Sequence, residues 1–234
     1  MRNLLVTTFL TLDGVYQAPG GPEEDPSGGF TEGGWSVNYW DDLMGQLMDQ
    51  TLAAPFDLLL GRRTYEIFAA HWPYVGEDPA LEAAPEGLVE THDETAQKLN
   101  HARKYVASRT LDRVDWQNST LLRGDVAEQV AQLKQQPGPE IQVHGSGNLI
   151  QTLLAHDLVD RYRLWLFPVV VGGGKRLFAD GTHPRGLKLV DSQTSTTGVV
   201  IATYEPAGAI QHGSFDFEQP TDAELARRRK LAAE

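Results

Sequence analysis

Cysteine is absent from the 234-residue chain. Its absence excludes disulfides, thiol chemistry and cysteine-ligated metal sites, and it suits a reducing compartment. No apolar run approaches the roughly 18 residues that a membrane-spanning helix requires. The first residues, MRNLLV, run directly into a strand-like segment and lack the apolar core and cleavage site of a signal peptide. We therefore expect a cytoplasmic protein that does not bind a membrane.

Positive charge is also scarce. The chain carries 20 Lys and Arg against 32 Asp and Glu, a formal net charge of −12. Such a protein is a poor partner for nucleic acid or for an anionic membrane surface. An anionic small molecule would need locally clustered donors to overcome this field, and Arg62, Arg63 and Arg109 are the candidates. The hydrophobic fraction of 41% is ordinary for a globular protein with a substantial core.

Apolar residues follow strand and helix periods in turn, which predicts an α/β layered sheet. Strands are expected at 4–9, 56–60, 104–108, 120–122, 141–144, 162–166, 187–191 and 199–204, and helices at 39–53, 64–70, 126–134 and 148–155. Residues 20–34 and 76–100 are expected to be long loops, the second with at most a little helix.

The domain organisation follows from the absence of any linker-like segment before about residue 205. We expect one domain at 1–205 and a tail at 206–234, in which residues 223–233 form a short basic helix. This helix could dock on a partner copy in a homodimer or remain solvated. Its few apolar residues favour the solvated state.

The first strand-to-helix junction, at residues 58–66, has the composition of a phosphate site. Gly61 at the strand end lets the backbone approach a ligand, and the first N–H groups of the next helix carry partial positive charge. Arg62 and Arg63 add charge-assisted donors, with Thr64 beside them. The alternative is a simple turn with a solvated arginine pair.

The second junction, at residues 141–154, follows the same order of strand, glycine-rich turn and helix. Gly145 and Gly147 match only half of a dinucleotide fingerprint, because Ile150 stands at the third glycine position. His144 also breaks the pattern of a nucleophile elbow, and a hydrolase using Ser146 with His144 lacks a third member. The GGGK run at 172–175 lacks the rest of a P-loop and is interpreted as a bend after a strand.

Five segments in order give a more specific pattern: TLDG at 11–14, GRRTYE at 61–66, VASRT at 106–110, VHGSGNL at 143–149, and LVD at 158–160 leading to PVVVG at 168–172. With them the chain resembles the dihydrofolate reductase-like superfamily, and within it the small proteins related to the reductase domain of riboflavin biosynthesis, the RibD C-terminal domain. The resemblance implies a three-layer fold with a mixed, mostly parallel central sheet flanked by helices.

The resemblance also implies an NADPH-dependent oxidoreductase without a metal, which transfers a hydride to a small pterin- or pyrimidine-like heterocycle. The cofactor residues it implies are Gly61, Arg62, Arg63 and Thr64 at the pyrophosphate and adenosine, Ser108 and Arg109 with Thr110 at the 2′-phosphate, and Gly145, Ser146, Gly147, Asn148 and Leu149 at the pyrophosphate and nicotinamide ribose.

The substrate side depends on an acidic residue at the start of the first helix, for which Asp41 is the catalytic candidate. Trp35 and Tyr39 could stack on a heterocycle, which would lie beneath the turn from Asp13 to Tyr16 and against the first helix. The alternative is that Asp41 favours a helix N-terminus electrostatically and that the two rings belong to the core. A non-catalytic nucleotide-binding or sensing protein remains the rival function, because no residue is an unambiguous proton donor.

Overall fold

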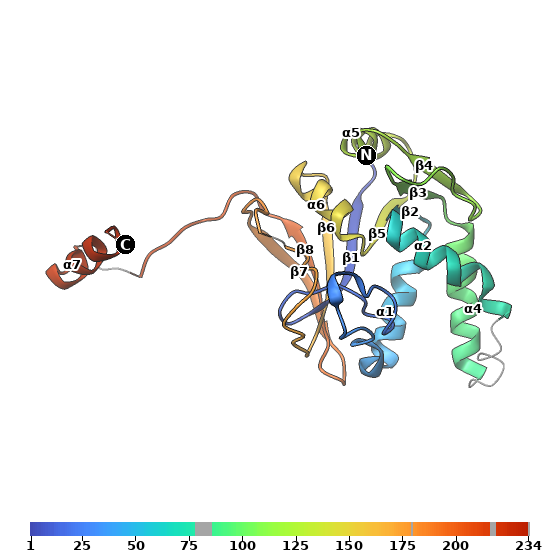
Figure 1. Cartoon of the computed structure of the whole chain (residues 1–234), viewed down its shortest axis with the longest axis horizontal. Helices are drawn as coiled ribbons and strands as arrows, with labels where there is room; N and C mark the ends of the chain where they lie inside the picture. Colours follow the sequence, from blue (N-terminus) through green and yellow to red (C-terminus); the bar gives the residue numbers. More distant parts are fainter. Residues whose placement is uncertain (78–85, 179, 216–218, 234) are drawn as a thin grey trace.

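A computed structural model describes residues 1–77, 86–178, 180–215 and 219–233. Within them, eight strands form a sheet in the order β4-β3-β2-β5-β1-β6-β8-β7 (Figure 1). The strands are β1 (Leu4–Thr11), β2 (Phe56–Gly61), β3 (Lys104–Ala107), β4 (Ser119–Leu122), β5 (Glu140–His144), β6 (Arg161–Phe167), β7 (Leu187–Thr194) and β8 (Val200–Pro206). The pairs from β4 to β6 are parallel, while β8 and β7 add antiparallel strands. The predicted α/β class with a mixed, mostly parallel sheet is confirmed.

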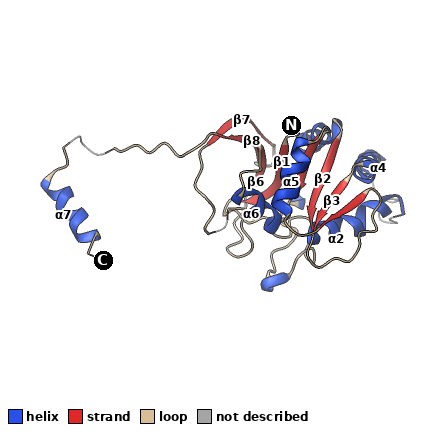
Figure 2. Ribbon diagram, turned by 90° about the horizontal axis from the view of Figure 1, so that it is seen from above, coloured by secondary structure: helices blue, strands red, loops and turns tan. Residues whose placement is uncertain are grey.

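Helices flank the sheet (Figure 2). The helices are α1 (Asp42–Ala53), α2 (Arg62–His71), α4 (Glu86–His101), α5 (Val126–Gln135), α6 (Gly147–Ala155) and α7 (Asp222–Leu231), with short 3₁₀ turns at Ser27–Gly29, Val37–Tyr39 and Trp72–Glu77. None of the helices in the described ranges is long and apolar enough to cross a membrane.

The central strands are apolar on both faces, as parallel strands covered by helices usually are. In β2, Leu59 packs in the cluster formed with α5 and α6, while Leu58 and Leu60 pack in the cluster formed with α1, α2 and α4. A third cluster joins α1 to β6 through Met44 and Trp165. Two layers of helices thereby hold the strand ends in fixed positions.

The structure corrects the expectation that residues 76–100 form a loop. Residues 86–101 form helix α4, whereas residues 78–85 lie outside the described part of the chain. The final turns of α4 bury Ala96 and Leu99, and Leu99 packs in the cluster that contains Leu58 and Leu60 of β2. The acidic and polar residues around these two positions mask the helical period in the sequence.

The end of the chain stands apart from the sheet. β8 ends at Pro206, residues 207–215 form no helix or strand, and α7 lies away from the sheet and its helices in Figure 1. Helix α7 buries no residue, and its N-cap Thr221 accepts a hydrogen bond from the N–H of Glu224 (3.3 Å). The predicted basic helix is therefore present and solvent-exposed.

Candidate functional site

The two strand-to-helix junctions lie side by side at the carboxyl edge of the sheet. Strands β3, β2, β5 and β1 are consecutive neighbours, and each ends at this edge. Because β2 pairs with β5, the turn after Gly61 meets the turn after His144. Ligands of open α/β sheets bind outside the carboxyl ends of the strands. The edge is therefore the natural place for a binding site.

Hydroxyl groups connect the two junctions directly. The N–H of Gly61 donates to Ser146 Oγ (2.9 Å), and Ser146 Oγ donates to Thr64 Oγ1 (2.7 Å). A Cβ at Gly61 would lie 3.1 Å from Ser146 Cβ, so glycine permits this close approach. Three of the residues assigned to the cofactor by resemblance thus form one contact.

The helices that start at these junctions lack side-chain caps. Helix α2 follows Gly61 and α6 follows Ser146, which adopts a left-handed backbone (φ 71°), and neither preceding residue makes a side-chain cap. Helices α1, α5 and α7, in contrast, are capped by Asp41, Asp125 and Thr221. Uncapped first turns leave N–H groups and the positive end of the helix dipole available to an anion.

The predicted cofactor residues at this edge differ in the exposure of their side chains. Asn148 is exposed at the start of α6, whereas Leu149 is 6% exposed and packs in the core. The predicted role of Leu149 is thereby limited to its backbone. Arg62 is exposed and pairs with Glu66 (3.3 Å), one turn along α2.

Ser108, Arg109 and Thr110 lie beside the first junction because Ala107 pairs with Gly61. Ser108 Oγ accepts hydrogen bonds from the N–H groups of Thr110 (3.1 Å) and Leu111 (3.0 Å), which fixes the turn. Arg109 is exposed at the tip of this turn. An exposed guanidinium beside the uncapped start of α2 is well placed to bind an anion.

Tyr16, which the sequence predicted only as the end of the turn above the substrate, packs against the start of α6. Its ring lies so close to Gly147 that a Cβ there would meet the phenol oxygen at 1.7 Å. Burial, and secondarily the negative charge of Asp25, raises the pKa of Tyr16 to about 12. The phenol is therefore neutral at the start of α6, and a glycine is required at position 147.

Arg63 and Lys175 converge on the long loop at 20–34. Arg63 donates to Asp25 Oδ1 (2.6 Å) and Ser27 Oγ (2.6 Å). Lys175 donates to the other carboxylate oxygen of Asp25 and to Ser27 Oγ (2.7 Å). The GGGK run at 172–175, interpreted from the sequence as a simple bend, thus brings a second cation to the first junction. The only sequence signal was a lysine after three glycines.

The two carboxylates predicted for the substrate side are engaged within the chain. Asp41 Oδ1 accepts from the N–H of Met44 (3.0 Å), and its Oδ2 accepts from the N–H (2.8 Å) and Oγ1 (2.7 Å) of Thr196. These bonds, first the one from Met44, lower the pKa of Asp41. The structure thus places Asp41 as the cap of α1 and as an anchor for the β7–β8 turn; its catalytic role stays a prediction.

Asp13 organises the turn after β1. Thr11 Oγ1 donates to Asp13 Oδ1 (2.6 Å), and this bond lowers the pKa of the carboxyl. The N–H of Gly172 donates to Asp13 Oδ2 (2.9 Å). The carboxylate therefore ties the first loop to the segment after β6, and its contact with a substrate stays a prediction.

The aromatic residues near α1 form a cluster over β1 and β6. Trp35 and Tyr39 pack edge-on against Phe167, with ring centroids 5.3 and 6.0 Å away. Trp40, which sequence reasoning passed over, stacks parallel to Trp165 at 6.1 Å and is 44% exposed. Trp40 thus offers an accessible ring, whereas Trp35 and Tyr39 contribute to the core.

His144 ends β5 on the face covered by α1 and α2. Its Nε2 lies 3.1 Å from Gln142 Oε1, and because that oxygen only accepts, Nε2 carries the proton. Burial lowers the pKa of His144 to about 4. The ring is therefore neutral at physiological pH, with an unprotonated Nδ1.

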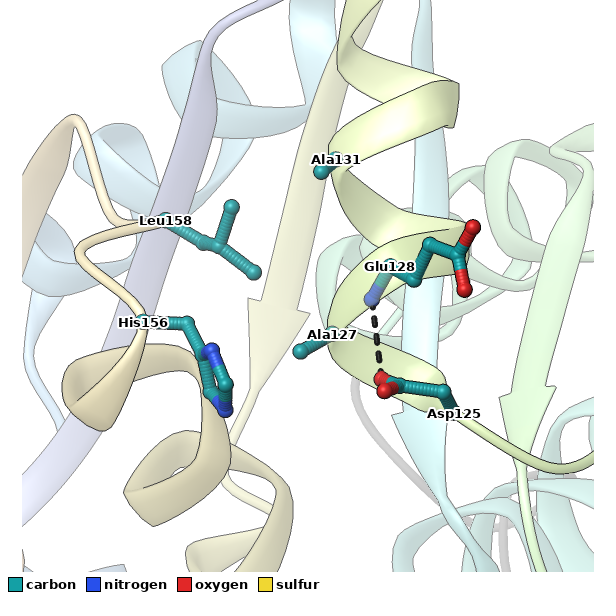
Figure 3. Close-up of a pocket in the computed structure, with 6 residues that line it drawn as sticks. All are labelled: Asp125, Ala127, Glu128, Ala131, His156 and Leu158. Atoms are coloured by element: carbon teal, nitrogen blue, oxygen red, sulfur yellow. Dashed lines mark hydrogen bonds between the residues drawn. The ribbon is translucent and has the colours of Figure 1, made fainter.

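Two cavities in the described ranges are lined mainly by residues outside the two junctions. One, of about 250 Å³, is bordered by the start of α5 and by His156 (Figure 3). The other, of about 620 Å³, lies among Tyr65, Tyr74 and Trp116. Of the residues in the two junctions, only Tyr65 and Glu66 line either cavity, and both line the larger of these two.

Comparison with known proteins points to one family. The family model for the RibD C-terminal domain matches residues 2–201. Among curated proteins, the uncharacterized protein YyaP of Bacillus subtilis (strain 168) is 30% identical over 207 residues, which cover 87% of this chain and 94% of YyaP.

Solved structures share the fold at low sequence identity. A putative riboflavin biosynthesis protein from Shewanella sp. PV-4 has a TM-score of 0.57 at 19% identity and covers 87% of this chain and 98% of its own. A pyrimidine reductase-like protein from Corynebacterium diphtheriae gives 0.54 at 12%, covering 90% and 93%. Dihydrofolate reductase from Enterococcus faecalis, complexed with NADP(H), gives 0.50 at 14%, covering 88% and 96%.

Proposed function

The chain belongs to the RibD C-terminal domain family, and from this we propose that it is an NADPH-dependent reductase that transfers a hydride to a small pyrimidine- or pterin-like heterocycle. The fold is that of the dihydrofolate reductase-like proteins. One structural neighbour is described as pyrimidine reductase-like and another was solved with NADP(H), which supports the cofactor and the substrate class.

The observation that carries the proposal is the contact between the two uncapped helix starts. Ser146 Oγ joins the turn at Gly61 to the start of α6, so the first N–H groups of α2 and α6 converge. A pyrophosphate, with two adjacent anionic groups, fits such a donor set. Arg63 adds a charge-assisted donor at the same place.

Each part of the edge has a distinct task. The helix starts would bind the pyrophosphate, and exposed Arg109 would bind the 2′-phosphate and so select NADPH over NADH. Trp40 would give a flat surface for the substrate ring, and neutral His144 would accept a hydrogen bond at Nδ1. Bound NADPH would supply the hydride, while the protein orients the two rings and excludes water.

The rival function is supported by a specific observation. Asp13 and Asp41, the two carboxylates predicted for the substrate side, both accept hydrogen bonds within the chain. A protein that binds NADPH as a sensor would need no proton donor. Binding and turnover must therefore be measured separately.

The test is calorimetric titration with NADPH and NADH, followed by NADPH oxidation across a panel of pyrimidine and pterin substrates. Arg109→Ala should weaken NADPH binding about tenfold or more, because a charge-assisted bond contributes about 1.5–3 kcal/mol. Binding of NADH should be unchanged. Arg113→Ala, which removes an exposed arginine paired with Asp115, is the matched control.

The outcomes separate the two functions. Absence of NADPH binding by the wild-type protein refutes the reductase proposal. Binding without oxidation of NADPH by any substrate in the panel favours the sensor. Equal losses of NADPH and NADH affinity in Arg109→Ala would remove the role assigned to that arginine.

A further inference from the structure

Two cations of different origin share one carboxylate at the edge of the first junction. Arg63 stands in the first turn of α2, and Lys175 follows the glycine run after β6. Both donate to Asp25, and both donate to Ser27 Oγ. The Asp25 side chain is 17% exposed, against 51% for Arg63 and 36% for Lys175.

This group carries one positive charge in excess. Two cations face a single carboxylate, within a chain whose formal net charge is −12. The ring of Tyr16 covers Gly147 at the start of α6. The charge of Asp25 raises the pKa of Tyr16 and that of Arg63 lowers it, in addition to the larger effect of burial, which is consistent with this group lying near α6. An excess of positive charge beside uncapped helix starts is suited to a doubly charged anion rather than to a carboxylate alone.

We propose that Arg63 and Lys175 form an anion subsite for the cofactor's pyrophosphate, and that the Asp25 carboxylate occupies this subsite until the cofactor displaces it. The inference rests on the proposed function and extends it in two ways. Lys175 becomes a cofactor-binding residue, and Asp25 becomes a competitor that lowers the affinity for the anion.

Displacement of Asp25 does not require the loop to unfold. The side chain of Gln17 donates to the carbonyl oxygens of Asp25 (2.8 Å) and Ser27 (2.9 Å). Its own carbonyl oxygen accepts from the N–H of Lys175 (3.1 Å). The Asp25 carboxylate also accepts from the N–H (3.3 Å) and Oγ (2.5 Å) of Ser27. Because the Gln17 bonds do not involve that carboxylate, and because asparagine keeps a side-chain oxygen at position 25, Asp25→Asn should leave the loop in place.

The experiment titrates the purified full chain with NADPH and, separately, with inorganic pyrophosphate. Asp25→Asn is compared with Glu23→Gln, which removes the same charge from an exposed position two residues away. Lys175→Gln is compared with Lys188→Gln on the exposed strand β7. Thermal unfolding of each variant checks that the fold is retained.

Asp25→Asn should tighten binding of both ligands by about three- to tenfold, within the range expected when two partly exposed ion pairs no longer compete. Lys175→Gln should weaken both by about tenfold. The two control variants should stay within about twofold of wild type. The gain from Asp25→Asn should be smaller in the Lys175→Gln background, because the carboxylate then competes for one cation.

The results distinguish this inference from the proposed function. If NADPH binds but Asp25→Asn behaves like Glu23→Gln, the subsite is wrong and the reductase proposal stands. If NADPH does not bind but pyrophosphate binds more tightly to Asp25→Asn, the subsite stands and the reductase proposal fails. An equal gain with and without Lys175 would overturn the assignment of that lysine.

Discussion

Substitution of Gly147 by alanine tests the close packing at the start of α6. The added Cβ would lie 1.7 Å from the Tyr16 oxygen and 2.1 Å from Cζ, so the ring must move. Overpacking of this kind costs about 1–3 kcal/mol of unfolding free energy, and more when the neighbour cannot relax. In a Tyr16→Ala background the obstacle is gone, and Gly147→Ala should be neutral or stabilising by up to about 1 kcal/mol. The predicted coupling energy between the two positions is therefore about 1–4 kcal/mol.

Urea unfolding, followed by tryptophan fluorescence, measures this coupling. Gly173→Ala is the matched control, because a Cβ at Gly173 meets no atom within 4 Å. That variant should unfold like the wild-type protein. The reasoning is refuted if Gly147→Ala alone is as stable as wild type, or if its cost is the same with and without the Tyr16 ring.

Three further predictions concern the core, the α1 cap and pH. Arg2→Met should lower the free energy of unfolding by about 3–5 kcal/mol, because Asp57, which is buried with Arg2 and 2.5 Å from it, loses its ion-pair partner. Adding Asp57→Leu should recover most of this loss. A loss under about 1 kcal/mol for Arg2→Met would contradict a buried ion pair between the two residues. Asp41→Ala should lower the free energy of unfolding by about 1–2 kcal/mol, and Asp41→Ser should lower it much less, because serine also caps helices. A Ser variant that is stable yet inactive in NADPH oxidation would instead support a catalytic role for Asp41. The pKa of His144 is about 4 in the folded protein and 6.5 in the unfolded chain. Between these two pH values the unfolded chain binds one more proton than the folded protein does. The free energy of unfolding therefore falls as the pH drops from 6.5 to 4. His144→Gln should remove on the order of 3 kcal/mol of this pH dependence, measured by urea unfolding at pH 7 and pH 4; identical pH profiles would show that the histidine is not buried as described.

The sequence predicted the two junctions because their determinants are local. A strand, a glycine and a helix lie within about ten residues of each other, and a parallel sheet then places neighbouring strand ends together. The contact between Thr64 and Ser146 follows from that geometry. The basic tail helix was predictable for the same reason, since its cap and its charges lie within one short segment.

The remaining features depend on long-range packing. Asp25 and Lys175 are 150 residues apart, and only the path of the loop at 20–34 brings them together. The ring of Tyr16 packs against the backbone of Gly147, and no hydrophobic period in the sequence predicts this contact. Asp41 could be read as a cap or as a substrate contact, and only the bonds from Met44 and Thr196 show how its oxygens are used.

The central claim is that the starts of α2 and α6 together bind the pyrophosphate of NADPH. A crystal structure of the complex tests it most directly. The account predicts the pyrophosphate within hydrogen-bonding distance of backbone N–H groups from both helix starts, with the 2′-phosphate at Arg109 and Asp25 displaced from Arg63. A cofactor bound elsewhere, for example in the cavity beside Trp116, or a pyrophosphate that contacts neither helix start, would contradict it.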